Sequence, residues 1–242
     1  MEAAVMADKL TGWIREKTID AGCEGVILGI SGGIDSAVVA GLAVRAFPNN
    51  TLGVIMPCES LPEDIEHGRL VAQKYGFELM VVDLFPIYKS FTGLLQGRDS
   101  KRSGLAQANI KPRLRMITLY YYAQERNYLV LGTGNRSELT IGYFTKYGDG
   151  GVDLLPIGGL VKSQVRELAR YLEVPQVVID KPPSAGLWEG QTDEGEIGLS
   201  YEDLDQYILS GQGSERVKEK VKNLSRISQH KLQTPPVAVF QE

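Results

Sequence analysis

The chain has 242 residues and a formal net charge of −4, with 43% hydrophobic and 23% charged residues. This balance is typical of a globular protein, which argues against a disordered chain, and no apolar run is long enough to predict a membrane span. The mildly acidic charge argues against general nucleic-acid binding. Cys23 and Cys58 form no CxxC pair, which argues against a disulfide framework or a structural zinc site. The N-terminal segment lacks the apolar core of a signal peptide, so we expect a cytoplasmic location.

Strands and helices are predicted to alternate through the first half of the chain. Short apolar runs predict buried strands at 25–31, 51–56, 78–83 and 128–133, and helical spacing predicts helices at 3–20, 36–47, 63–75, 86–96 and 111–127. This alternation predicts an α/β fold with a doubly wound parallel sheet covered on both faces. Further on, Gly- and Pro-rich pieces separate helices predicted at 162–172 and 200–209, and the segment 214–228 is predicted to hold one or two more helices. We therefore expect one domain, residues 1–242, with a helical C-terminal portion.

Charge is distributed unevenly along the chain. The segment 96–116 has one acidic residue, Asp99, and six basic ones, namely Arg98, Lys101, Arg102, Lys111, Arg113 and Arg115. The segment 186–205 contains acidic residues and no basic one. A basic stretch in an acidic protein favours a small anionic ligand over a polymer.

A glycine-rich turn, Gly-Ile-Ser-Gly-Gly-Ile-Asp-Ser at 29–36, connects the first predicted strand to its helix. Gly32 and Gly33 lack Cβ atoms, so backbone N–H groups there can approach an anion closely. The turn is neither a Walker A loop nor GxGxxG. Asp35 would repel a phosphate unless a cation lay between them, and Mg²⁺ is the cation that carboxylate and phosphate oxygens hold together.

These residues resemble the SGGxDS pattern of the PP-loop ATP pyrophosphatases, which cleave ATP between its α- and β-phosphates. Further segments resemble one branch of that superfamily, the NAD synthetases. They are NIKPRLRM at 109–116, LGTGNRSE at 131–138, FTKYGDGGVD at 144–153, LLPIGGLVK at 154–162, KPPS at 181–184, DEGEIGLSY at 193–201 and HK at 230–231.

The resemblance implies a Rossmann-like fold of the adenine nucleotide alpha hydrolase type. It also implies a reaction in which ATP adenylates the nicotinate carboxylate of deamido-NAD, and ammonia then gives NAD, AMP and pyrophosphate. The implied catalytic residues are Asp35, Lys162 and Asp153. The implied magnesium ligands are Asp35 and Glu138.

Matching motifs also imply the residues that bind each substrate. ATP would be bound by Ile30, Ser31, Gly32, Gly33, Asp35, Ser36, Thr133, Lys162 and Ser184. Deamido-NAD would be bound by Arg113, Lys146, Asp153, His230 and Lys231. Ammonia is largely ammonium at neutral pH, so a carboxylate is needed to bind it, and Asp149 and Asp153 are candidates. A purely structural role in the loop is an equal alternative for both residues.

The chain departs from the family pattern in three places. Ser184 stands where the family often has Thr, and Pro112 replaces a more common Ala. The GNRSE segment at 134–138 also differs from members that have acidic or His residues there.

Alternatives remain open. Another PP-loop amidating enzyme, such as a GMP synthetase-type domain, would share SGGxDS but should lack FTKYGDG. A tRNA-modifying PP-loop enzyme and a nucleotide-binding module without chemistry are further alternatives.

Three expectations concern assembly and motion. A homodimer is implied by the resemblance, and apolar residues of the helix at 111–127 are compatible with it, although they fit a core equally: Ile117, Leu119, Tyr120, Tyr121 and Tyr122. No segment matches a glutaminase, so free ammonia or ammonia from a separate protein is expected. The segment 186–198 is expected to be mobile and to close over ATP.

Overall fold

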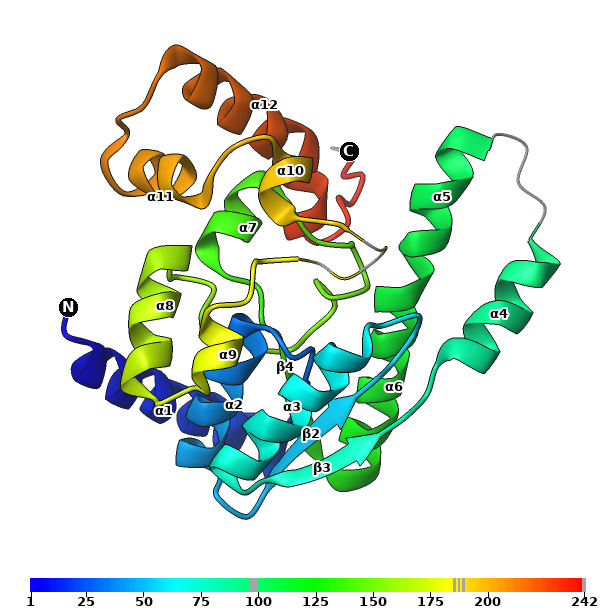
Figure 1. The fold of residues 1–242 in the computed structure, drawn as a ribbon, viewed down its shortest axis with the longest axis vertical. Coiled ribbons are helices and arrows are strands. Elements are labelled where there is room, and N and C mark those ends of the chain that lie inside the picture. Colours follow the sequence, from blue (N-terminus) through cyan, green and yellow to red (C-terminus); the bar gives the residue numbers. More distant parts are fainter. Residues whose placement is uncertain (96–99, 185, 187, 189, 241–242) are drawn as a thin grey trace.

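The computed structural model describes residues 1–95, 100–184, 186, 188 and 190–240 (Figure 1). Its strands are β1 (Gly25–Gly29), β2 (Thr51–Ile55), β3 (Glu78–Val81) and β4 (Tyr128–Leu131). Helices before β4 are α1 (Ala3–Asp20), α2 (Ile34–Ala46), α3 (Pro62–Tyr75), α4 (Phe85–Leu94), α5 (Ser100–Ala108) and α6 (Ile110–Arg126). Helices after β4 are α7 (Arg136–Ile141), α8 (Lys162–Tyr171), α9 (Gln176–Ile179), α10 (Asp193–Ile197), α11 (Tyr201–Ser210) and α12 (Glu215–Leu232).

The four strands form a parallel sheet in the order β3-β2-β1-β4, which confirms the predicted doubly wound sheet. Side chains of β1 alternate between its two faces. Val26 and Leu28 pack in a core with α1, α2 and α8, whereas Ile27 packs in a second core with α6. Helices thus cover both faces of the sheet, as Figure 1 shows.

The strand order creates a switch point between β1 and β4. From β1 the chain builds outward to β2 and β3, and it then returns to add β4 on the other side of β1. Ligands of open α/β sheets bind at such points, beyond the carboxyl ends of the strands. The turn at 29–36 follows β1, and LGTGNRSE at 131–138 follows β4, so the topology brings these two motifs together.

The predicted helical C-terminal portion is also confirmed. α11 and α12 pack with α7 around a separate apolar cluster that includes Leu204, Val217 and Val221. The hydroxyl of Ser200 accepts a hydrogen bond from the Asp203 N–H, so Ser200 caps α11 as predicted. Helices α5, α7, α9 and α10 were not expected, and the segment 214–228, which was predicted to hold one or two helices, lies in the single helix α12 apart from its first residue. In the described ranges, every helix is too short or too polar to cross a bilayer.

Candidate active site

The turn after β1 is a tight backbone cradle at the start of α2. Gly32 is buried with φ +76°, and a Cβ there would lie 2.3 Å from the Asp64 carbonyl oxygen, so only glycine fits without displacing α3. The Ser31 and Ser36 hydroxyls lie 3.1 Å apart, and the Ser36 hydroxyl donates to the Gly33 carbonyl. Buried Ile30 is held by its N–H bond to the Val54 carbonyl of β2.

Two predicted carboxylates and the predicted lysine meet beside this turn. Lys162 Nζ lies 2.6 Å from Asp35 Oδ2 and 3.5 Å from Glu138 Oε1. The Lys162 side chain is only 2% exposed, and the side chains of Asp35 and Glu138 are 18% and 16% exposed. Residues from α2, α7 and α8, which belong to three separate sequence motifs, therefore form one compact ionic site.

Asn135 joins these residues, although sequence reasoning gave it no role. Its side-chain amide donates to Asp35 Oδ1 at 3.0 Å, and its side-chain carbonyl accepts from the Glu138 N–H at 3.0 Å. Its own N–H donates to Glu138 Oε2 at 3.1 Å, which completes a capping box at the start of α7. We call Asp35, Asn135, Glu138 and Lys162 the carboxylate cluster.

Burial and neighbouring charges both shift the pKa values of the ionisable groups in this cluster. Burial raises the pKa of Glu138, and the charge of Asp35 adds to the rise while Lys162 opposes it. Burial alone would lower the pKa of Lys162, but attraction to Asp35 and Glu138 outweighs it and raises that pKa. Lys162 is therefore the shared partner of the two carboxyl groups.

A tyrosine links the carboxylate cluster to the acidic C-terminal segment. The Tyr201 hydroxyl lies 2.9 Å from Asp193 Oδ2 and 3.3 Å from Glu138 Oε1, and its ring faces Lys162. Asp193 is buried and also receives a hydrogen bond from Tyr143. The expected mobility of 186–198 remains a prediction; within that segment Leu187 and Glu189 lie outside the described residues.

Asp205 is a second residue that sequence reasoning missed. Its buried carboxylate accepts hydrogen bonds from the Lys162 and Ser163 N–H groups at the start of α8 and from the Ser137 hydroxyl of α7. A carboxylate at a helix N-terminus satisfies free N–H groups and favours the helix dipole. Asp205 thus fixes the two helices that carry Lys162 and Glu138.

Four predicted dinucleotide-binding residues meet at a different place, between α6, the loop after α7 and the end of α12. Arg113 donates to the Lys146 carbonyl at 3.2 Å, and Lys146 donates to the His230 carbonyl at 2.5 Å. Lys231 donates to the Gly142 and Phe144 carbonyls. We call Arg113, Lys146 and Lys231 the cationic group, and His230 lies beside it.

Asp153 stands apart from both sets in its contacts. Its Oδ2 accepts from the Val130 N–H of β4 at 2.8 Å, and its Oδ1 accepts from the Tyr120 hydroxyl at 2.9 Å. Both oxygens therefore bind the protein and extend the hydrogen bonding of β4. Asp149 accepts a hydrogen bond from the Thr145 N–H.

The remaining predicted ATP residues, Thr133 and Ser184, lie on other segments of the chain. Thr133 is half-buried just beyond β4. Ser184 is exposed, and its hydroxyl accepts from the Gly186 N–H. Three residues earlier, Lys181 forms an ion pair with Asp64, whose carbonyl faces Gly32, so the KPPS segment is fastened beside the glycine turn.

The basic segment at 96–116 is only partly open to solvent over the residues 104–116 whose burial the structure describes. Lys111 is buried and pairs with Glu59 at 2.7 Å. Arg115 donates to the Met56 carbonyl and the Ser60 hydroxyl. Arg98 and Asp99 lie outside the described residues. The described part of this segment is thus held partly by internal contacts.

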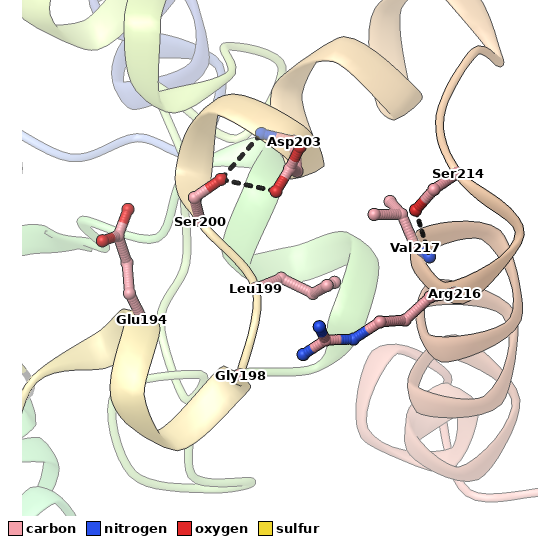
Figure 2. Close-up of a pocket in the computed structure, with 8 residues that line it drawn as sticks. All are labelled: Glu194, Gly198, Leu199, Ser200, Asp203, Ser214, Arg216 and Val217. Carbon is pink, nitrogen blue, oxygen red and sulfur yellow. Dashed lines mark hydrogen bonds between the residues drawn. The ribbon is translucent and has the colours of Figure 1, made fainter.

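A surface hollow of about 320 Å³ lies between the α10–α11 connection and α12. Figure 2 shows the residues that line it. The Arg216 side chain extends across it from α12. Its lining residues are Glu194, Gly198, Leu199, Ser200, Asp203, Ser214, Arg216 and Val217, none of which is a predicted site residue. The carboxylate cluster is therefore separate from this hollow.

Comparisons with known proteins agree with these motifs. The family model described as NAD synthase matches residues 6–235. An NH(3)-dependent NAD(+) synthetase of Carboxydothermus hydrogenoformans is 55% identical over 234 residues, which cover 96% of each chain.

Solved structures also match along the whole chain. The NMN synthetase from Francisella tularensis has a TM-score of 0.92 and 37% identity, over 99% of this chain and 100% of that one. An NH3-dependent NAD synthetase from Campylobacter jejuni has a TM-score of 0.81 and 30% identity, over 99% of this chain and 100% of that one. The chain therefore belongs to the NAD synthase family.

Proposed function

We propose that this chain uses ATP and ammonia to amidate the nicotinate carboxylate of deamido-NAD, giving NAD, AMP and pyrophosphate. The observation that carries the proposal is the meeting of Asp35, Glu138 and Lys162 beside the glycine turn at the switch point of the sheet. Relatives named NH(3)-dependent NAD(+) synthetases support the choice of substrate and of nitrogen source.

The glycine turn is proposed to hold the phosphates of ATP. Backbone N–H groups of 31–33 and the N-terminus of the 13-residue helix α2 supply donors for anionic oxygens. The residues proposed to contact ATP are Ile30, Ser31, Gly32, Gly33, Asp35, Ser36, Thr133, Lys162 and Ser184.

Asp35 and Glu138 fit a magnesium site that the substrate completes. Both carboxylates face one cation, the Lys162 ammonium, so they are oriented toward a common positive charge. Among the described residues no group of three or more potential metal ligands occurs. Two carboxylates together with substrate phosphates are a usual way to bind Mg²⁺. When bound, Mg²⁺ would neutralise charge on the ATP phosphates.

The reaction has two displacements. An oxygen of the nicotinate carboxylate attacks the α-phosphorus of ATP, and the bond to pyrophosphate breaks. Ammonia then attacks the acyl carbon, loses a proton, and AMP leaves with the former carboxylate oxygen. Lys162 is a fixed cation that stabilises negative charge developing on the phosphoryl oxygens.

The cationic group and the neighbouring His230 are proposed to bind deamido-NAD, whose diphosphate is anionic. Arg113 can contact such groups with two parallel hydrogen bonds. Its present partner is a backbone carbonyl, and the side chain is exposed. A ligand anion can therefore replace that bond without leaving a buried group unpaired.

Asp153 and Asp149 remain proposed for the nitrogen substrate, and Asp153 for dinucleotide contact. Ammonia is largely ammonium at neutral pH, so a group that binds the cation or accepts its proton is required. Replacing each residue with Asn while ammonia is titrated tests the role. An unchanged KM for ammonia in both variants would leave Asp149 and Asp153 with structural roles only.

A mononucleotide substrate is a second candidate. The neighbour with a TM-score of 0.92 is named an NMN synthetase, so the corresponding reaction would amidate nicotinate mononucleotide. Both substrates present the same carboxylate to the carboxylate cluster. They differ in the adenylate half, which supplies the second phosphate of the diphosphate that the cationic group would bind.

A homodimer is proposed from the exposed apolar surface of α4 and α6. Ile117 and Tyr121 are 59% and 64% exposed, and Ile87 and Phe91 of α4 are also exposed. The other three helix residues considered for this role have internal positions: Leu119 is buried, and Tyr120 and Tyr122 pack on the core. Size-exclusion chromatography with light scattering, before and after Tyr121→Glu, tests the dimer.

The assay that tests the function combines ATP, Mg²⁺ and either ammonia or glutamine with either deamido-NAD or nicotinate mononucleotide. The proposal predicts NAD from deamido-NAD with ammonia, AMP and pyrophosphate in equal amounts, and no product with glutamine alone. Product from the mononucleotide only would favour the second candidate. No amide product from either substrate would refute both. The cytoplasmic location, the single domain and the lack of a nucleic-acid or membrane partner stay predictions.

A further inference from the structure

Asn135 occupies the centre of the carboxylate cluster and is fully buried. We propose that Asn135 is a positioning residue that holds Asp35 and Glu138 in the orientation needed to bind one divalent cation together with ATP. The inference rests on the proposed function, because it concerns the same site. It adds a residue whose role none of the recognised motifs assigns.

Each carboxylate is held at one oxygen by Asn135 and faces Lys162 with the other. Asp35 accepts the Asn135 amide at Oδ1 and Lys162 at Oδ2. Glu138 accepts the Asn135 N–H at Oε2 and faces Lys162 with Oε1. Two contacts to different oxygens fix the plane of each carboxylate, which is how outer partners orient metal ligands.

The chemistry at this position suits asparagine. The side-chain carbonyl caps the Glu138 N–H while the amide nitrogen donates to Asp35, so one side chain serves as acceptor and donor at once. Aspartate would cap the helix but place a second acceptor against Asp35. Serine would cap the helix but is too short to reach Asp35 as the amide does, and alanine would do neither.

The backbone around Asn135 is fixed independently of its side chain. The Arg136 N–H donates to the Leu160 carbonyl, and the Leu139 N–H donates to the Asn135 carbonyl. Asn135 therefore stands on a supported helix start and joins a residue 100 positions away, across the switch point between β1 and β4. This placement lets one residue set the relative orientation of ligands from two separate elements: its side-chain amide holds the Asp35 carboxylate, and its N–H holds the Glu138 carboxylate at a helix start that its side-chain carbonyl caps.

The experiment compares Asn135→Ser, which keeps a helix cap but removes the amide, with Asn135→Ala, which removes both. Mn²⁺ in the presence of ATP is the metal probe, and free Mn²⁺ is measured by electron paramagnetic resonance. Both variants should bind Mn²⁺ about 10-fold more weakly than the wild type. AMP binding without metal, measured by calorimetry, should be unchanged. The Mg²⁺ concentration for half-maximal activity should rise by about the same factor.

Ser214→Ala is the matched control, because Ser214 caps α12 by accepting from the Val217 N–H. It should lower thermal stability while leaving Mn²⁺ affinity unchanged. If Asn135→Ser does not fold, Asn135→Thr provides the same loss of the amide with a cap retained.

A folded Ser or Thr variant with wild-type Mn²⁺ affinity would overturn the inference, even if the wild type makes NAD. Weaker Mn²⁺ binding in the variants would support the inference even if the wild type failed to make NAD, a failure that would refute the proposed function alone.

Discussion

The carboxylate cluster and the cationic group use their charged side chains in different ways. In the carboxylate cluster, side chains bind side chains from different helices, and Lys162 is 2% exposed. In the cationic group, Arg113, Lys146 and Lys231 bind backbone carbonyls, and Arg113 and the neighbouring His230 are exposed. The carboxylate cluster is thus preorganised for the charge that develops during the reaction. In the cationic group, each cation can give up its hydrogen bond to a backbone carbonyl and bind a ligand anion instead. Substitutions in the carboxylate cluster should therefore lower kcat, and substitutions in the cationic group should raise the KM for deamido-NAD.

Lys162→Met should give the largest effect. The substitution removes the cation that faces both carboxylates and stabilises the phosphoryl charge, so kcat should fall about 10²–10³-fold. Steady-state NAD formation at saturating substrates measures the loss. Lys218→Met, on the exposed surface of α12, is the control and should keep wild-type kcat. A Lys162→Met enzyme within about twofold of wild type would remove Lys162 from catalysis.

Gly32→Ala should come next, because it strains the turn itself. The added Cβ would meet the Asp64 carbonyl at 2.3 Å, and the residue would keep φ +76°. We expect a loss of about 1–3 kcal/mol in unfolding free energy and a higher KM for ATP. Gly12→Ala is the matched control, since a Cβ on Gly12 meets no atom within 4 Å. Gly12 lies inside α1, so alanine there should be neutral or stabilising by about 0.5–1 kcal/mol. Equal melting temperatures for the two variants would contradict this account of Gly32.

Asp205→Asn tests whether the C-terminal helices support the carboxylate cluster. The substitution replaces one carboxylate oxygen, which accepts an N–H of α8, with an amide NH₂ group that cannot accept. The loss should lower the free energy of unfolding by about 1–3 kcal/mol. Urea denaturation measures the cost, and kcat should fall with it because α8 carries Lys162. Glu202→Gln, exposed on the same helix, is the control and should change the urea midpoint little. An Asp205→Asn protein with wild-type stability and kcat would show that α8 is held by other contacts.

Arg113→Gln should give a moderate effect confined to the dinucleotide. Losing one charge-assisted contact should raise the KM for deamido-NAD about 10-fold and leave the KM for ATP and kcat unchanged. Initial rates with each substrate varied in turn measure the split. A large fall in kcat instead would mean that the cationic group also contributes to catalysis and does not act in dinucleotide binding alone.

Ser184→Thr should have the smallest effect. The hydroxyl is exposed and retained by the substitution. The free energy of unfolding should therefore change by less than about 0.5 kcal/mol, and the KM for ATP should stay close to the wild-type value. Thermal denaturation and ATP titration check both values. A larger change would show that the added methyl group disturbs the KPPS segment.

The sequence predicted the sheet well because each strand is a short apolar run followed by a turn. The family resemblance implies Asp35, Glu138 and Lys162 as site residues, because each lies in a local motif near the end of a strand or at the start of a helix. The short helices α7, α9 and α10 have four to six residues, too few for a helical period to show. Their positions depend on packing rather than on local pattern.

The supporting residues were missed for a different reason. Tyr201 and Asp205 contact residues 63 and 68 positions away, and such pairs leave no local signal. Asn135 did have one, since Asn135 and Glu138 have the spacing of a capping box. That spacing indicates a helix start, but only the fold shows that the same amide reaches Asp35.

Transfer of oxygen from substrate to AMP tests the proposed reaction most directly. Deamido-NAD labelled with ¹⁸O in the nicotinate carboxylate is incubated with ATP, Mg²⁺ and ammonia, and AMP is analysed by mass spectrometry. Attack of the carboxylate on the α-phosphorus predicts one labelled oxygen in each AMP formed with NAD. NAD formation with unlabelled AMP would contradict an adenylated carboxylate at this site.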